Sequence, residues 1–137
     1  MRFQGTVYRD SGLWLAEVPV FDAMTQGRTR SNALEMIRDW FETMVGEEGF
    51  SVEVHPGKAG DFEVSSPDLR RMIGLLLQRR RQQSGLSLRQ AAERLGARSP
   101  NAYARYERGD CLPTVDKLDE LLRAVGERDV VVKESVA

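Results

Sequence analysis

The pattern of apolar and polar positions predicts a first half built mainly of short strands. Residues 3–9 and 13–18 alternate apolar and polar positions at a period of two, which is typical of half-buried β-strands. Gly12 lies in the short connection between them, so the pair predicts a hairpin. Residues 23–27 predict a shorter third strand. It follows Pro19, which donates no hydrogen bond to a sheet and favours an edge or a break.

One helix stands out in this half. Between residues 29 and 46, apolar side chains recur at helical spacing from Leu34 to Met44. Thr29 or Ser31 can cap its start, and Gly46 can end it.

Two further short strands and a boundary follow this helix. Residues 50–54 return as a strand, and residues 61–64 can add another. Turn-forming residues then accumulate, namely Gly57, Gly60, Ser65, Ser66 and Pro67. They predict a boundary near residue 66, with domains over 1–65 and 66–137.

The second half predicts a series of four capped helices. The first begins with Ser66 as its cap and Pro67 at the first helical position, and Gly85 ends it. The second opens with a capping box formed by Ser87 and Gln90.

The third and fourth helices have the same signals. Ser99 caps the third and Pro100 starts it, while Thr114 caps the fourth. The apolar face of the fourth helix is formed by Val115, Leu118, Leu121, Leu122 and Val125. Residues 129–137 can be a disordered tail or a strand exchanged across a dimer, and we favour a short strand.

Charge divides the chain at the same boundary. The 41% apolar and 30% charged composition is that of an ordinary globular protein, and the net charge is only −1. Residues 1–67 nevertheless carry 6 Lys or Arg against 11 Asp or Glu, a net charge of −5. Residues 68–126 carry 12 against 7, a net charge of +5. Solvated charged faces alone can produce such a split, but opposite signs across one boundary favour two different partners.

Several classes of function are not expected. A single cysteine, Cys111, forms no disulfide within the chain and fits a reducing compartment. The sequence has no apolar run typical of a signal peptide or a membrane span, so we expect a cytoplasmic protein without a membrane partner. Cys111 with the single His55 cannot supply the usual metal site, so we expect no metal or cofactor. The carboxylates Asp10, Glu17 and Glu53 are not brought together by their spacing, so we do not expect an enzyme.

The second half contains a helix-turn-helix pattern. Two short helices are joined by a tight turn at Gly96, an arrangement whose second helix enters the DNA major groove. In that second helix, Asn101 and Arg105 lie four residues apart and share a face. An asparagine can bond adenine and an arginine can bond guanine through two hydrogen bonds each.

Residues 67–126 resemble the XRE family of repressor-type DNA-binding domains. The resemblance rests on the segments GLSLRQAAERLG, YARYERG and PTVDKLDELLRAV, which follow in the family's order. Two departures stand out: the turn GARSP is one residue longer, and Leu88 replaces a polar residue that touches phosphate in the family. The resemblance implies that Tyr103 and Tyr106 point into the core, and that Glu107 pairs with Arg81.

The predicted DNA contacts form two groups. Arg98 in the turn and Arg108 after the helix suit phosphates. Arg79 and Arg80 suit phosphates or, equally, a solvated helix face. The predicted base contacts are Asn101, Ala102, Ala104 and Arg105, and the predicted phosphate contacts are Arg79, Arg80, Ser87, Gln90, Arg98, Ser99 and Arg108.

The first half resembles the HicB antitoxin domain over residues 3–55. The matching residues are Glu17, Val18, Pro19, Thr25, Gln26, Gly27, Thr29 and Ala33, and the departure is Arg30-Ser31-Asn32 where acidic residues commonly open the helix. The resemblance implies a truncated ribonuclease-H-like sheet that binds and silences HicA, a small basic RNA-cutting toxin. An acidic domain suits such a partner electrostatically.

These observations predict an α+β protein with a βββαβ sheet domain followed by an all-α helix-turn-helix domain. The function they favour is that of an antitoxin that binds a HicA-like toxin and represses its own operon on double-stranded operator DNA. We expect a homodimer or a higher even oligomer, since such domains read paired half-sites. The alternative is a stand-alone XRE-family regulator whose first half senses a ligand or only dimerises.

Overall fold

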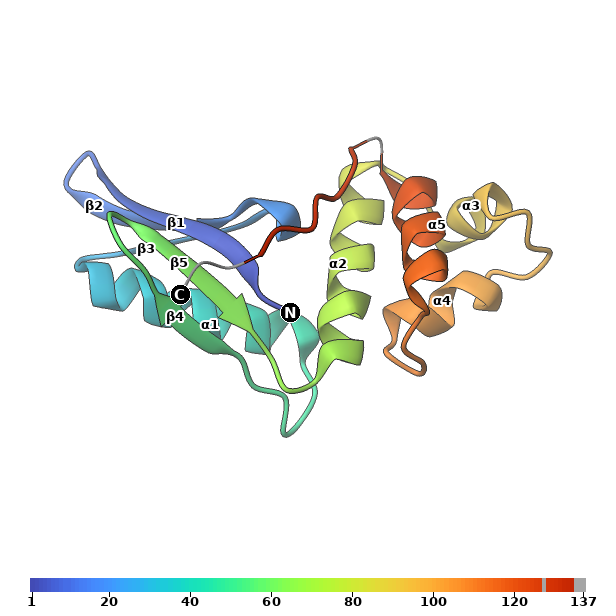
Figure 1. The fold of residues 1–137 in the computed structure, drawn as a ribbon, viewed down its shortest axis with the longest axis horizontal. Helices are drawn as coiled ribbons and strands as arrows, with labels where there is room; N and C mark the ends of the chain where they lie inside the picture. The colour runs from blue at the N-terminus through green and yellow to red at the C-terminus, as the bar shows by residue number, and fades with distance from the viewer. Residues whose placement is uncertain (127, 135–137) are drawn as a thin grey trace.

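In a computed structural model of the protein, residues 1–126 and 128–134 are described, and they form an α+β fold (Figure 1). The described residues contain one antiparallel sheet of five strands in the order β3-β2-β1-β5-β4. Its strands are β1 (Phe3–Asp10), β2 (Leu13–Val18), β3 (Ala23–Gly27), β4 (Glu53–Pro56) and β5 (Asp61–Ser65). The predicted α+β class is confirmed, and the optional last strand exists and pairs with β1.

The turn between β1 and β2 and the end of β2 both follow from the residues found there. Ser11 and Gly12 both adopt positive φ, 51° and 84°, which suits the tight turns that join twisted antiparallel strands. Pro19 begins the short 3-10 helix η1 (Pro19–Phe21) and so ends β2. This turn buries Phe21 completely in the core beneath the sheet.

Helix α1 (Arg30–Val45) covers one face of the sheet (Figure 1). Of the two predicted caps, Thr29 is used: its Oγ1 accepts a hydrogen bond from the Asn32 N–H at 3.0 Å. Gly46 ends the helix with a left-handed φ of 66°, as predicted. The residues that α1 buries against the sheet are Ala33, Leu34, Ile37 and Phe41.

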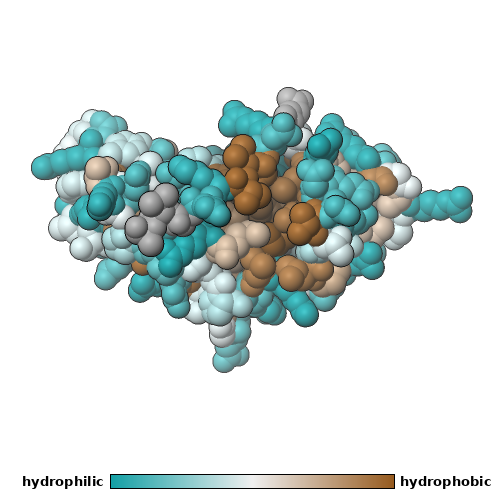
Figure 2. Space-filling view, viewed as in Figure 1, coloured by the Kyte–Doolittle hydropathy of each residue, from teal (hydrophilic) through white to brown (hydrophobic). Residues whose placement is uncertain are grey.

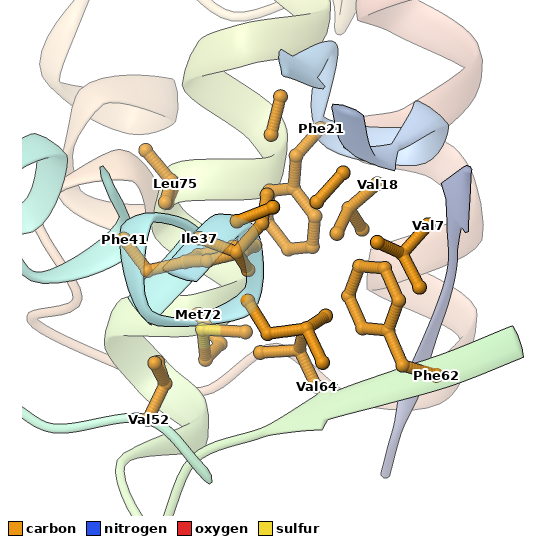
Figure 3. Close-up of a cluster of buried hydrophobic side chains, with 14 of the residues drawn as sticks. Val7, Val18, Phe21, Ile37, Phe41, Val52, Phe62, Val64, Met72 and Leu75 are labelled. Atoms are coloured by element: carbon orange, nitrogen blue, oxygen red, sulfur yellow. The ribbon is translucent and has the colours of Figure 1, made fainter. Parts of the chain in front are cut away.

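Helix α2 (Leu69–Gln83) contributes side chains to two separate cores. Met72, Leu75 and Leu76 belong to the cluster under the sheet, and Figure 3 shows Met72 and Leu75 reaching into it. Ile73 and Leu77 belong to the cluster of the helical half. The predicted boundary near residue 66 thus falls just before an element that both halves share.

The predicted cap of α2 is wrong. Asp68 caps the helix instead, because its Oδ1 accepts a hydrogen bond from the Arg71 N–H at 3.2 Å. Ser66 is engaged elsewhere, since its Oγ donates to the Ser51 carbonyl at 2.7 Å and accepts from the Asp68 N–H at 3.1 Å. Pro67 therefore precedes the helix rather than starting it.

The helical half packs α4 (Asn101–Glu107) and α5 (Val115–Val125) against α2, and α3 (Leu88–Arg94) packs against α4 and α5. Its buried cluster consists of Ile73, Leu77, Ala91, Ala92, Tyr103, Tyr106, Leu121 and Val125. Thr114 caps α5 as predicted, its Oγ1 accepting from the Lys117 N–H at 3.2 Å. Val115 was expected on the apolar face but is 85% exposed, because the buried stripe begins one turn later at Leu118.

The segment after α5 forms no strand within this chain, and a strand exchanged across a dimer stays a prediction. Residues 128–134 contain neither helix nor strand, and the rest of that prediction, 135–137, lies outside the described residues. This segment, dark red in Figure 1, pairs with none of the described strands, and Val131 and Val132 are exposed. Figure 2 shows apolar residues gathered over the middle of the same face, with hydrophilic residues towards both ends.

Candidate DNA-binding surface

Two short helices and the turn between them form the centre of this surface. The capping box at the start of α3 is confirmed, because Ser87 Oγ accepts from the Gln90 N–H at 3.1 Å and Gln90 Oε1 accepts from the Ser87 N–H at 2.8 Å. Gly96 has a φ of 73° and lets the chain leave α3 in a tight turn. The local sequence thus sets both the start and the end of the first helix of the pair.

The inner face of α4 holds the two tyrosines. Tyr103 is fully buried and Tyr106 nearly so, which confirms their predicted place in the core. The Tyr103 hydroxyl donates to the Leu77 carbonyl of α2 at 3.3 Å. Burial, and then the neighbouring Glu107 carboxylate, raises the pKa of Tyr103 well above its ordinary value. Neither ring is available for stacking on a base.

The outer face of α4 is lined by residues at helical spacing from Asn101 to Arg108. Arg105 is exposed there, and its guanidinium lies 5.0 Å from the centre of the Tyr106 ring. Arg108 bridges the two ends of this face: it donates to Asn101 Oδ1 at 2.8 Å and to Asp110 Oδ2 at 2.9 Å. The structure therefore brings Asn101, Arg105 and Arg108 together on one exposed face.

The two alanines of the predicted base contacts differ in accessibility. Ala102 is half-buried, whereas Ala104 is only 7% exposed although it lies on the outer face. Helical spacing places Ala104 between Asn101 and Arg108, which are hydrogen-bonded to each other. Its methyl group offers little surface to a base in this conformation, so the structure lends no support to that predicted contact.

The predicted phosphate contacts of the turn and of α3 are exposed. Arg98 and Ser99 lie in the turn, and Ser99 Oγ accepts from the Asn101 N–H at 3.3 Å. Ser87 and Gln90 are exposed as well, although their side chains cap each other. Arg89 was not among the predicted contacts, yet it is an exposed cation beside both. Its position in the first turn of α3 was the signal that could have selected it.

Arg79 has a role inside the molecule that its sequence position did not reveal. Its Nε and Nη2 donate to the carbonyls of Phe21 and Asp22, both at 2.9 Å. Its guanidinium also lies 5.3 Å from the centre of the Trp40 ring. These contacts hold α2 against η1 and α1. Its Nε and Nη2 are engaged with the sheet half, so the structure lends no support to the predicted phosphate contact of Arg79.

Arg80 is half-buried rather than presented to solvent. Its Nε is buried without a hydrogen-bond partner among the described residues. Burial, and then the nearby charge of Arg128, lowers the pKa of Arg80 from its ordinary value. The Arg80 guanidinium lies close to Gly126, the residue that follows α5.

The predicted ion pair between Arg81 and Glu107 is confirmed. Two parallel hydrogen bonds join them, from Arg81 Nε to Glu107 Oε2 at 2.6 Å and from Nη2 to Oε1 at 3.0 Å. The side chains are 15% and 9% exposed, respectively. Arg81 also donates to the Leu86 carbonyl at 2.9 Å. The pair thus ties α2 to the end of α4 and fixes the outer face of α4 relative to the rest of the domain.

Residues 73–134 match the sequence model of a helix-turn-helix domain family. The match starts inside α2, includes α3, α4 and α5, and ends in the segment after α5. No curated protein matches the chain. The helix-turn-helix domain supports DNA as a partner and indicates DNA binding or transcription regulation.

Other kinds of site receive no support from the described part of the chain. Within residues 1–126 and 128–134, no group of three or more His, Cys, Asp or Glu side chains could hold a metal ion. Over the same residues, no helix combines the length and apolar character that crossing a bilayer would need.

Proposed function

We propose that this protein is an antitoxin of the HicAB kind. Its first half binds and neutralises a small basic mRNA-cleaving toxin, and its helix-turn-helix domain represses its own operon by binding operator DNA. The protein acts by binding at both ends and catalyses no reaction. A basic toxin and a DNA operator carry opposite charges, and the chain has a separate half suited to each.

The observation that carries this proposal is the separation of charge along one chain. The sheet half has a net charge of −5, and residues 68–126 have a net charge of +5 and contain most of the helix-turn-helix domain. Opposite charge speeds association and suppresses wrong partners. An acidic half would weaken a protein devoted only to DNA, so its charge is better explained by a basic partner.

We further propose that two copies bind the operator together. One recognition helix as short as α4 contacts few base pairs, and helix-turn-helix proteins usually read two half-sites about one helical turn apart. A two-fold dimer, or a higher even oligomer, would present two copies of the Asn101–Arg108 face.

Co-expression with the adjacent gene product tests the antitoxin function. We expect the full chain to co-purify with a short basic protein encoded next to it and to abolish that protein's cleavage of RNA. If cleavage continues unchanged at saturating amounts of the full chain, the protein is a regulator of another kind. A stand-alone regulator would then be favoured.

Substitutions at Arg105 and Arg108 test how the DNA is read. Arg105→Ala should weaken binding to the DNA upstream of the gene by about 1–3 kcal/mol and relax preference at one base pair per half-site. Arg108→Ala should weaken binding to all sequences alike and reduce the salt slope by about one unit per monomer, because this residue is expected to contact phosphate. Both are measured on operator and scrambled duplexes at several salt concentrations.

Each variant serves as the other's control. Equal losses for Arg105→Ala on both duplexes would remove its base-reading role. Specificity would then fall to Asn101, which Arg108 must release before its amide can bond adenine.

A further inference from the structure

The sheet has a second face that no helix covers. Side chains alternate along each strand, so those that do not pack under the sheet towards α1 point to the outer side. Three large side chains lie near one another there: Tyr8 and Leu15 are direct cross-strand partners, and Met24 is the partner of Glu17 on the neighbouring strand. Tyr8 and Met24 are among the exposed large apolar residues of the protein. The part of the outer face formed by β1, β2 and β3 therefore carries an apolar cluster, the centre of the proposed surface.

Carboxylates share the outer face with this cluster, most of them towards β5 and β4. Five carboxylates occupy outward positions of the described strands: Asp10, Glu17, Glu53, Asp61 and Glu63. No outward position of these strands carries a lysine or an arginine. Arg2, which precedes β1, reaches Glu63 at 3.1 Å. The Tyr8 hydroxyl donates to Glu17 Oε1 at 2.8 Å, so the aromatic ring and the carboxylate are held together.

This arrangement has the anatomy of a protein interface. Interface centres are enriched in aromatic residues and methionine, and charged residues lie at the rim. A negative rim selects a positively charged partner and speeds its approach. DNA is excluded by like charge. A second copy meeting this face about a two-fold axis would oppose carboxylates with carboxylates.

The face is also accessible while the other half binds DNA. Helix α2 contributes Met72, Leu75 and Leu76 to the cluster under the sheet, on the side that α1 covers. The helix-turn-helix domain is thus attached through the covered side, and it lies beside one end of the sheet (Figure 1).

We propose that the outer sheet face, centred on Tyr8, Leu15 and Met24, is the docking surface for a small basic protein. This inference rests on the proposed antitoxin function and names the surface that performs it. The apolar centre provides the affinity, and the five carboxylates provide the rate and the choice of partner.

Paired substitutions in the full chain test this surface, with the short basic protein encoded by the adjacent gene as the probe. Met24→Lys places a cation at the centre of the face, where the side chain is 57% exposed. Its matched control is Met36→Lys on α1, where the side chain is 39% exposed on the other side of the sheet. Asp61→Lys tests the rim, and Glu35→Lys on α1 is its control.

We expect Met24→Lys to weaken binding of the probe about tenfold or more, as truncation of an interface anchor does. Asp61→Lys should weaken it severalfold and flatten its dependence on salt, because rim charges act through screened electrostatics. Both control variants should bind within about twofold of the wild type, which is the range of substitutions outside an interface. Thermal unfolding and operator binding should be unchanged in all four variants, since each altered position is exposed.

The possible failures are distinguishable. If the wild-type chain does not bind the probe, the antitoxin function fails and this surface fails with it. If the wild type binds and both outer-face variants bind equally well, the antitoxin function stands and this surface is wrong. Loss of binding in the α1 variants alone would place the partner on the opposite side of the molecule.

Discussion

A fragment of residues 1–66 is expected to remain unfolded, whereas a fragment of residues 1–85 is expected to fold. The shorter fragment lacks Met72, Leu75 and Leu76, which are buried in the cluster under the sheet. Losing one such side chain costs about 2–5 kcal/mol. Three losses together are comparable with the whole stability of a small domain, about 5–15 kcal/mol.

Far-UV circular dichroism and urea unfolding of the two fragments provide the measurement. The longer fragment should carry Ile73→Gln and Leu77→Gln, because these side chains would otherwise expose the apolar side of α2 that faces the helical half. The result would be contradicted if residues 1–66 unfolded cooperatively at the same urea concentration as residues 1–85. Such an outcome would mean that the sheet with α1 is a complete domain and that α2 only rests against it.

Glu107→Ala is expected to lower the free energy of unfolding by about 3–5 kcal/mol, which is the usual loss when one partner of a buried pair is removed. The guanidinium of Arg81 would stay largely buried without its carboxylate. Arg81 would retain only its hydrogen bond to the Leu86 carbonyl. Because the pair joins α2 to α4, operator binding should fall as well, since the outer face of α4 would lose its fixed position.

The chain provides a matched control for this substitution. Asp119 and Arg123 form a surface pair at 3.3 Å whose side chains are 67% and 72% exposed, respectively. Asp119→Ala should change the free energy of unfolding by at most about 1 kcal/mol, because water screens exposed pairs. Urea unfolding of both variants decides the comparison, and equal small losses would show that burial of the Arg81–Glu107 pair contributes little.

The double substitution Arg81→Met with Glu107→Leu distinguishes two effects: the loss of the ion pair itself, and the cost of leaving one buried charge without its partner. Replacing both partners of a buried pair by apolar side chains is often neutral or stabilising. We therefore expect the double variant to recover most of the stability that Glu107→Ala loses. A double variant as unstable as the single one would indicate that the two hydrogen bonds themselves hold the helices.

The sharing of α2 joins the two proposed activities physically. Arg79 bonds the carbonyls of Phe21 and Asp22 in the sheet half, and Arg81, two residues later, bonds Glu107 of α4. Phe3, Leu69 and Leu122 pack against both buried clusters. The helix-turn-helix domain is therefore held against the sheet domain by packing and hydrogen bonds, and not only by the chain between them.

Local patterns in the sequence determined most of the elements. Period-two alternation located β1, β2 and β3, and helical spacing located α1, α3 and α5 within a few residues of their bounds. The caps Thr29, Ser87 and Thr114 were identifiable because a capping side chain acts on an amide only two or three residues away. The helix-turn-helix pattern was recognisable for the same reason, since it is made of short elements in a set order.

Contacts between distant residues were decided only by the tertiary structure. Ser66 was a plausible cap from the sequence, but its bond to Ser51 leaves that role to Asp68. Three consecutive arginines look alike in the sequence. In the fold, Arg79 bonds the sheet half, Arg80 is half-buried under α5 and Arg81 pairs with Glu107. Successive positions of a helix differ in direction by about 100°, so the partner of each side chain depends on which element lies on that side. The sequence alone determines the direction of each residue, and the packing of α2 between two cores determines what each residue meets.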